Sequence, residues 1–363
     1  MDEMIKKQLN SFDPQERAQA LKAVYHANSS FNMHCHSFYS YNGYGYSPSM
    51  LAAVAKENSW RGAMLVDFDV LDGVDEFLRA CRMLGVKAAA GMETRVFIPE
   101  LADVEINSPG EPGIAYHLGC GFTSSEVPES EKAFAGNLRA KANARTRILV
   151  EKVNAALPEI AVDFNAVAAK LTPNGNVTER HVCTAYREMA EQCFKGSELA
   201  AFWQEKIGGF EENPVKLEAL IRSKTMKRGG AGYVAPTPES FPTLEEMNKF
   251  IINCGAAPTL AWLNGLSAGE NDVDRLFELH LKYGLKAATL IPDRNWRADT
   301  AEKQAKLTAE LDRFVAAAVR YNIPLLAGTE MNAPGQLIAD DFTNPALIKH
   351  LDVFSAGADV FAK

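Results

Sequence analysis

Two histidines near the start of the chain have a spacing that suits a metal site. His34 and His36 lie in the stretch NMHCHSFYSYNGYGYSP and are separated by one residue. Residues i and i+2 of a regular strand project from the same face, so both imidazoles can reach one ion. Taken alone, this H-x-H pair is a weak signal, because two histidines at the end of an ordinary strand would look the same.

Acids and a further histidine follow or lie within other apolar runs. Asp67 and Asp69 follow GAMLV, Glu93 lies in AGMETR, His117 lies in AYHLGCGF, and Glu330 lies in AGTEMN. Each has an ordinary explanation by itself, since His117 could be a hydrogen-bonded core histidine and the glutamates could be surface acids. Their joint occurrence at expected strand ends favours a metal centre, and imidazole with carboxylate suits zinc, manganese or iron.

The hydrophobic pattern predicts an α/β barrel that would position these residues. Short apolar runs alternate with amphipathic helical segments on both sides of a polar, helical middle region. This order indicates parallel strands with helical crossovers, and such barrels gather active-site residues at the C-terminal ends of the strands. We expect one or two helices within residues 1–28. We also expect residues 1–123 to form these helices and the first part of the barrel, residues 124–236 a helical insertion, and residues 237–363 the rest of the barrel and a C-terminal tail.

The composition narrows the class of protein. The chain has 363 residues and a net charge of −8, which argues against binding to duplex nucleic acid or to an anionic membrane. Its N-terminal segment has no apolar stretch typical of a signal peptide, and no apolar run is long enough to span a bilayer. Six cysteines without a C-x-x-C pair fit free thiols. We therefore expect a cytoplasmic protein.

Several motifs in their order resemble those of the PHP superfamily (polymerase and histidinol phosphatase). These are HCHS with its glycine-containing loop, then VDFDVLDGVDEFLRACRMLGVKAAAGMETRV, then AYHLGCGF. The segments NARTRILVEKVNAAL, VTERHVCTAY and GGAGYVAPTPESFPTLEEMNKFIINCGAAPTLAWL resemble the insertion and return of one subfamily. That subfamily acts on nucleoside 3′,5′-bisphosphates and, as a 5′–3′ exonuclease, on short RNA ends.

The resemblance covers roughly residues 30–335 and implies both fold and cofactor. The implied fold is a distorted (β/α)7 barrel of TIM-like architecture with a helical insertion. The family holds up to three divalent metals, which activate water against a phosphoester. In that pattern the first metal falls on His34, His36, Glu93 and Glu330, the last of which replaces an aspartate.

The other two metal sites of the family are depleted in this sequence. The second site shares one glutamate with the first and keeps His117, but its remaining histidine position falls on Ala257. The third falls on or near Asn42, Phe68 and Asn332, which are weak ligands or none. We expect one or two divalent ions (Zn, Mn or Fe) on the five retained residues, which are His34, His36, Glu93, His117 and Glu330.

Two aspartates have predicted roles beside these ligands. Asp67 would orient a metal ligand from behind, since such partners fix the ring orientation of ligating histidines. Asp69 lies two residues further on and hence on the same face of an extended segment, so it could replace a lost ligand. The alternative for Asp69 is an aspartate that caps a helix or fixes a loop.

The insertion supplies candidates for binding phosphate. The match at ERHV makes His181 our preferred phosphate-binding or ligand-orienting residue, by analogy with the family's insertion, which covers the site. Arg145, Arg180 and Arg228 could neutralise a phosphate, and Lys227 is a further candidate. The ordinary explanation for each cation is a solvated helix face. The tyrosines of FYSYNGYGYSP could likewise stack on a base or simply pack within their loop.

The predicted function is a metal-dependent hydrolase, a phosphoesterase acting on a small phosphorylated metabolite or nucleotide through a metal-activated water. One metal site would be complete and one partial. The first alternative is a non-catalytic PHP-like protein that binds metal and a phosphorylated ligand. A second alternative is another metal-dependent hydrolysis, such as that of an amide or a lactone, in the same cleft.

Overall fold

The computed structural model describes residues 4, 7–8, 11, 13–17, 19 and 30–363. The helices expected within residues 1–28 therefore fall mostly outside the described residues. In the described part of the chain, no helix has the length and hydropathy needed to cross a bilayer.

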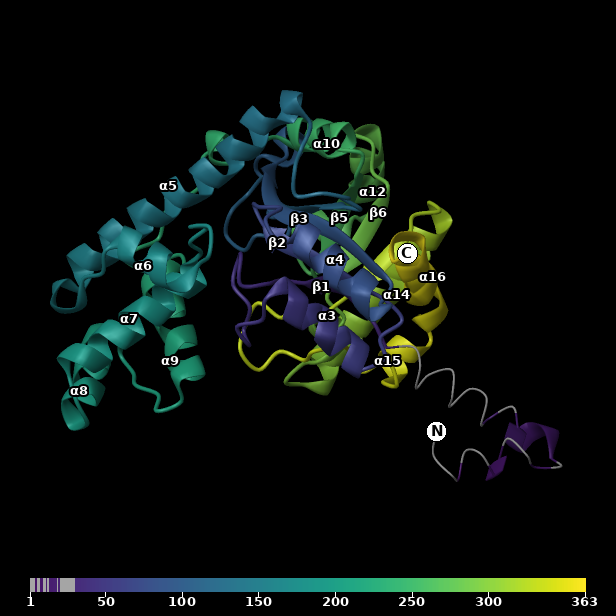
Figure 1. Cartoon of the computed structure of the whole chain (residues 1–363), viewed down its shortest axis with the longest axis horizontal. Coiled ribbons are helices and arrows are strands. Elements are labelled where there is room, and N and C mark those ends of the chain that lie inside the picture. The colour runs from purple at the N-terminus through teal and green to yellow at the C-terminus, as the bar shows by residue number, and fades with distance from the viewer. Residues whose placement is uncertain (1–3, 5–6, 9–10, 12, 18, 20–29) are drawn as a thin grey trace.

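Seven strands form one sheet that curls into a nearly closed barrel (Figure 1). Their order in the sheet follows their order in the sequence. A parallel bridge between Cys35 and Glu330 brings the segment after the last strand against the first. The predicted TIM-like barrel is therefore confirmed. The strands are β1 (Asn32–Cys35), β2 (Ala63–Phe68), β3 (Ala88–Phe97), β4 (Ile114–Cys120), β5 (Ala257–Trp262), β6 (Ala287–Leu290) and β7 (Leu325–Ala327).

The expectation that all strands run parallel is wrong at β4. This strand pairs antiparallel with both β3 and β5. The connection from β3 to β4 spans residues 98–113 and contains only the short 3-10 turn η1 (Pro99–Leu101), with no crossover helix. Without a crossover the chain can only return antiparallel. The C-terminal end of β4 therefore lies at the opposite rim from the C-terminal ends of its neighbours.

Helices cover the outside of the barrel (Figure 1). Sequence signals set their ends: the Ser47 side chain accepts a hydrogen bond from Met50 N at the start of α3, and Gly85 (φ 67°) ends α4 in the left-handed conformation. Trp262 stacks on Phe314 at 4.3 Å between barrel and helices. The outer helices are α3 (Pro48–Glu57), α4 (Val74–Leu84), α10 (Leu244–Asn253), α12 (Val273–Lys282), α14 (Ala301–Arg320) and α16 (Leu351–Phe361), with the short α11 (Ala268–Asn271), α13 (Asp293–Trp296) and α15 (Pro345–Ile348) between them.

A helical insertion leaves the barrel between β4 and β5. Its long first helix, α5 (Lys132–Ala156), projects away from the barrel (Figure 1). The insertion has a hydrophobic core of its own, with Tyr186 and Trp203 fully buried in it. The boundaries at residues 124 and 236 stay a prediction. The remaining helices are α6 (Phe164–Leu171), α7 (Glu179–Cys193), α8 (Ser197–Ile207) and α9 (Pro214–Ile221).

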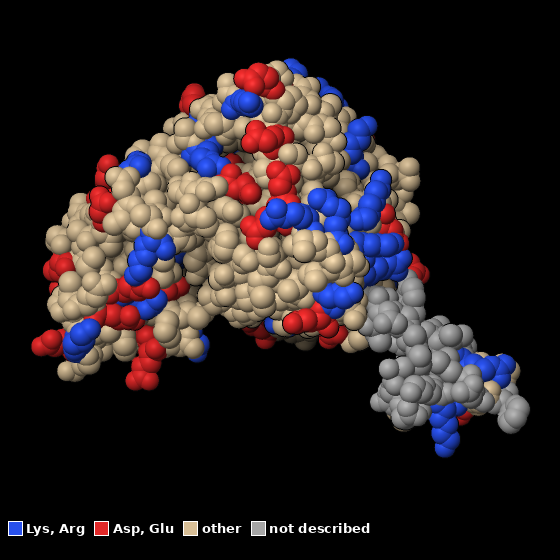
Figure 2. All heavy atoms as spheres, viewed as in Figure 1, with Lys and Arg blue, Asp and Glu red and all other residues tan. Residues whose placement is uncertain are grey.

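Charged side chains of both signs are interspersed on the face shown in Figure 2. Basic side chains gather there on the side where α4 and the C-terminus lie. The net charge of −8 therefore does not describe every part of the surface.

The close packing of α16 on β7 gives a test of the fold. A Cβ added at Gly357 would lie 2.0 Å from the backbone oxygen of Leu325. Gly357→Ala should therefore lower the free energy of unfolding by about 1–3 kcal/mol or more, as overpacking does. Gly136→Ala in α5 is the control, because nothing lies within 4 Å and alanine favours helix. Urea denaturation measures both, and a Gly357→Ala protein as stable as the wild type would contradict the packing.

Candidate metal centre

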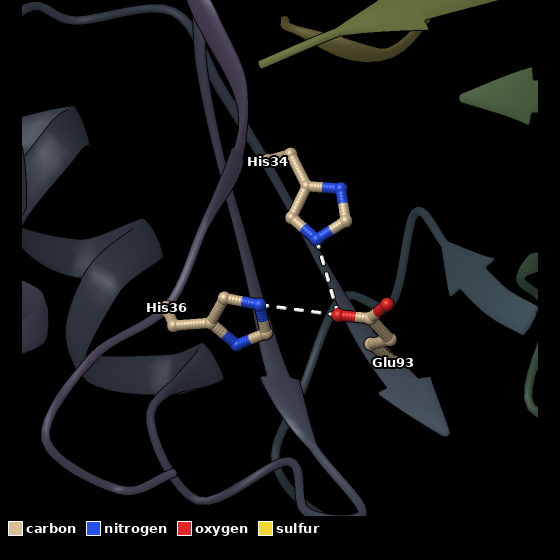
Figure 3. A group of neighbouring side chains, drawn as sticks. All are labelled: His34, His36 and Glu93. Carbon is tan, nitrogen blue, oxygen red and sulfur yellow. Dashed lines mark hydrogen bonds and ion pairs between the residues drawn. The ribbon is translucent and has the colours of Figure 1, made fainter. Parts of the chain in front are cut away.

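Three side chains converge inside the C-terminal rim of the barrel. His34 is in β1, His36 follows that strand, and Glu93 is in β3. Both Nε2 atoms lie 3.1 Å from Oε2 of Glu93. Figure 3 shows the two imidazoles pointing at the same carboxylate. One possible ligand atom from each residue lies within 4.8 Å of the others, which is compatible with one shared ion.

The burial of this cluster makes its unsatisfied atoms informative. The three residues are at most 3% exposed. His34 Nδ1 makes no hydrogen bond in the described part of the chain, and the neighbour of His36 Nε2 is the Glu93 carboxylate, 3.1 Å away. Two imidazole nitrogens facing one buried carboxylate oxygen are stabilised by a positive charge between them, which a cation would supply. Two imidazoles and one carboxylate fit a divalent ion such as zinc, manganese or iron and leave a position open for water.

The electrostatics of the cluster favour positive charge at its centre. Burial alone would raise the pKa of Glu93, but the charges of His34 and His36 and their hydrogen bonds lower it to about 2. Burial opposes protonation of His36, while the hydrogen bond and charge of Glu93 raise its pKa overall. The carboxylate thus stays ionised and draws positive charge toward it, from an imidazole proton or from a metal ion.

A hydrogen-bonded chain sets the orientation of His36. Ser40 Oγ donates to Asp67 Oδ1 at 2.6 Å and lies 3.2 Å from His36 Nδ1. Because the Ser40 proton is directed at Asp67, the serine oxygen accepts from Nδ1–H of His36. With Nδ1 protonated, Nε2 is the nitrogen that would give its lone pair to a metal.

Asp67 lies behind the ligands, one hydroxyl away from His36. Its carboxylate also accepts hydrogen bonds from Ser37 N at 2.7 Å and Ser37 Oγ at 2.6 Å. Burial raises the pKa of Asp67, while His36 and the serine hydrogen bonds oppose that rise. The placement supports an orienting role and not direct contact with the ion. Sequence reasoning missed Ser37 and Ser40, although both stand in the same HCHSFYS stretch.

Asn42 and Phe68, at the positions of the family's third metal, have packing and hydrogen-bonding roles instead. The ring of Phe68 stacks on His36 with centroids 4.6 Å apart. Asn42 Nδ2 donates to the backbone oxygen of His36 at 2.7 Å, and its side-chain oxygen accepts from Tyr44 N and Tyr46 N. Asp69 accepts from Thr94 Oγ1 at 2.5 Å and is not part of the ligand cluster. The loop after β1 is therefore held in place without a third ion.

Glu330 lies beside the cluster but is not part of it. Its backbone oxygen accepts from His36 N at 2.9 Å, and its Oε2 accepts from Arg294 at 2.7 Å and Gln336 at 3.1 Å. Glu330 and Met331 both have positive φ (67° and 56°), which is costly for residues with a Cβ. The role of Glu330 as a metal ligand stays a prediction, since its carboxylate is already ion-paired.

His117 does not reach this centre, contrary to the sequence prediction. Leu118 is the residue paired with Glu93, and His117 is paired with Thr94. Paired residues on neighbouring strands share a face, so His117 and Glu93 point to opposite sides of the sheet. His117 Nε2 lies 2.6 Å from Asn248 Oδ1 of α10. The ring therefore lies between the barrel and its outer helices.

The prediction that a strand ends at Ala257 is also wrong. Ala257 is the first residue of β5, which ends at Trp262. The C-terminal end of this strand thus carries an indole stacked on Phe314 and not a metal ligand. In the register of β4 and β5, Ala257 is paired with Cys120 and not with His117, and neither position belongs to the ligand cluster among the described residues.

The insertion reaches the centre through its segment before α7. Asn176 Nδ2 donates to the backbone oxygens of Tyr39 (3.1 Å) and Phe68 (2.9 Å), which ties the insertion to the loop after β1 and to the end of β2. His181 Nδ1 accepts from Thr178 N at 3.1 Å, and its ring meets Tyr41 edge to face at 5.1 Å. Burial lowers the pKa of His181 to about 4. Its proposed contact with phosphate stays a prediction.

The three candidate arginines differ in how many ion pairs, hydrogen bonds and ring contacts their guanidinium groups already make. Arg145 lies 3.8 Å from Asp69 and stacks on the Phe241 ring. Arg228 donates to the Gly110 oxygen at 3.2 Å and is exposed. Arg180 has no ion pair from its side chain in the described part of the chain, and burial together with Arg222 lowers its pKa. Of the three, Arg180 is the most available to an anion.

Comparison with known proteins defines the fold but not the function. No family model matches the sequence, and no curated protein matches it. Two solved structures are similar over most of their length. One is an amidohydrolase from Chromobacterium violaceum with bound sulfate and no metal, at 17% identity, TM-score 0.59, covering 89% of this chain and 96% of that chain. The other is a putative metal-dependent phosphoesterase from Bifidobacterium adolescentis, at 16% identity, TM-score 0.58, covering 88% and 95%.

This chain shares the fold of these two proteins. At such low identity the likeness concerns the fold alone, so the chemistry of the site must be argued from its own residues.

Metal binding should depend on the cluster and not on His117. We expect His36→Ala and Glu93→Gln to weaken binding of zinc or manganese by more than about 100-fold, because even indirect partners of a ligand are worth 10–100-fold. Equilibrium dialysis with elemental analysis measures this. The matched control is His117→Gln, which removes a buried histidine on the other face of the same sheet. Equal losses in all three variants would contradict the assignment.

The histidines outside the barrel predict a loss of stability in acid. Burial lowers the pKa of His117 to about 4, and burial together with His117 lowers that of His280. Neither nitrogen of His280 has a partner in the described part of the chain. The unfolded chain therefore binds more protons between its own histidine pKa (~6.5) and the lower folded values, so stability falls as pH drops through that window.

Replacing His280 tests this acid sensitivity. Burial and the neighbouring His117 hold the pKa of His280 well below its ordinary value, so the folded protein resists protonation of this ring. We expect His280→Leu to be about as stable as the wild type at pH 7 and to lose less stability on going to pH 5, measured by urea denaturation. An identical loss in both proteins would exclude His280 as its source.

Proposed function

We propose that this protein is a metal-dependent hydrolase of the PHP type that cleaves a phosphoester in a small phosphorylated metabolite or nucleotide. The carrying observation is the buried cluster of His34, His36 and Glu93 at the rim where barrel enzymes place their chemistry. The fold likeness to a putative metal-dependent phosphoesterase supports the proposal. A cytoplasmic location is part of the same proposal.

The residues of the chain have separate tasks in this reaction. A divalent ion on the cluster would lower the pKa of a water toward ~7 and polarise a phosphoryl oxygen. His34, His36 and Glu93 hold the ion, and Ser40 with Asp67 fixes the tautomer of His36. Arg180 at the start of α7 would meet the negative charge of the substrate, since phosphoester cleavage requires such neutralisation.

A non-catalytic binding protein is the second candidate. It is favoured by the missing second ion site, because His117 points away and Ala257 lies at the other end of its strand. Such a protein would keep the metal and the phosphorylated ligand but not turn it over. Amide hydrolysis is a third possibility, in line with the amidohydrolase of similar fold.

Turnover with defined metals distinguishes these functions. Metal-free protein would be reconstituted with manganese, zinc or ferrous iron and assayed against phosphomonoesters, nucleoside bisphosphates and amides. We expect metal-dependent phosphate release that falls by more than about 100-fold in His34→Ala, as expected for loss of the activated water. The control is His350→Gln, whose imidazole pairs with Asp312 on the outside of the barrel.

Activity that His34→Ala leaves unchanged would disprove the proposal. Tight binding of a phosphorylated ligand without turnover would favour the binding protein instead.

A further inference from the structure

Arg294 places a positive charge next to the metal cluster. It lies in α13, directly after β6, at the same rim of the barrel. One guanidinium nitrogen is 2.7 Å from Oε2 of Glu330, whose side chain is 9% exposed, while the arginine side chain is 43% exposed. The guanidinium thus has one side on a buried carboxylate, and part of it is open to solvent.

The position of this charge is fixed relative to the ligands. Glu330 is bound through its backbone oxygen to His36 N, and Gln336 donates to the same carboxylate oxygen as Arg294. The charges of Glu330 and Glu93 help to raise the pKa of Arg294. Arg294 is therefore a permanent cation attached, through Glu330, to one of the residues that would hold the ion.

This site has neither the ligands for a second divalent ion nor a negative charge that would require one. The residues that could have held it are absent or turned away, namely Ala257 and His117. Glu330, the remaining carboxylate beside the cluster, already has a cationic partner. One divalent ion and one guanidinium carry three positive charges against the two negative charges of Glu93 and Glu330, so this pair of glutamates already leaves one positive charge for an anionic ligand, and a second divalent ion would add two more.

We propose that Arg294 takes the place of a second cation, so that the centre uses one divalent ion and binds the anionic oxygens of a substrate phosphate through the guanidinium. This inference rests on the proposed function and narrows it to substrates with a charged phosphate near the ion. The side chain of Arg294 makes no other ion pair or hydrogen bond in the described part of the chain, so its remaining guanidinium N–H groups are available. A planar guanidinium matches two phosphate oxygens at once, which an uncharged amide substrate would not exploit.

Arg294→Gln tests the inference, with Arg297→Gln as the matched control. Arg297 lies in the same segment, 56% exposed, and pairs with Asp293. Metal content per chain would be measured by elemental analysis after dialysis against manganese or zinc. Binding of inorganic phosphate to the metal-loaded proteins would be measured by calorimetry, and thermal unfolding would check that each variant is folded.

We expect one ion per chain in the wild type. We also expect phosphate binding to be weakened by about 10- to 100-fold in Arg294→Gln, the cost of losing a hydrogen bond to a charged group, and to be unchanged in Arg297→Gln. Two ions per wild-type chain, or wild-type phosphate affinity in a folded Arg294→Gln protein, would overturn the inference and leave the proposed hydrolase standing. If the ion count and the phosphate affinities are as expected but no phosphoester is turned over, the proposed hydrolase is overturned and the role of Arg294 stands. A chain that takes up no metal would overturn both.

Discussion

The interaction on which the site depends is a buried carboxylate shared by two imidazoles. Glu93 is 3% exposed, and taking an ionised carboxylate out of water costs several kcal/mol unless opposite charge accompanies it. His34 and His36 face this carboxylate from a strand that is not its neighbour, because β2 lies between β1 and β3 in the sheet. In a flat sheet these side chains would stand two strand spacings apart, roughly 10 Å. The curvature of the barrel brings them to 3.1 Å, so closure of the barrel and assembly of the centre are one event.

The backbone around the cluster is held from several sides. The amide of His36 donates to Glu330 after β7, its ring nitrogen meets Ser40, and its carbonyl accepts from Asn42. Left-handed conformations gather in the same region: among the described residues with positive φ other than glycine are Tyr41, Asp69, Glu330 and Met331. Such conformations cost about 1–3 kcal/mol each and persist where the surroundings enforce them, which is typical of functional sites. The strain fits a centre whose ligands must stay in place when no ion is bound.

The sequence predicted the barrel and the core of the cluster because both are encoded in local patterns. As the i, i+2 spacing predicts, His34 and His36 face the same way and reach one carboxylate. Strands β2 and β3 lie where the apolar runs predict them. His117 could not be placed this way, since a shift of one residue in register moves a side chain to the other face. The stretch between TRVFI and GIAYH has no helical pattern, and this absence of a crossover helix predicts that β4 runs antiparallel to β3. The pairing of Arg294 with Glu330 joins residues 36 positions apart and depends on how β6 and β7 lie side by side, so no local pattern announces it.

The cations near the metal cluster fall into two groups, according to whether an acidic side chain already takes up their charge. Most are neutralised: Arg95 pairs with Glu111, and both Arg222 and Lys227 pair with Glu179, whose pKa they lower to about 2 against the effect of burial. These partly buried pairs lie within the barrel or within the insertion, and they have little positive charge left for a ligand. Arg180 has no such partner in the described part of the chain, and Arg294 uses only one side of its guanidinium. In a chain with a net charge of −8, the unpaired Arg180 and the free N–H groups of Arg294, which is paired with Glu330, are places where an anion can bind. The metal ligands alone would serve an ester, an amide or a phosphate equally, so in the function proposed here a preference for phosphate would have to come from these two arginines.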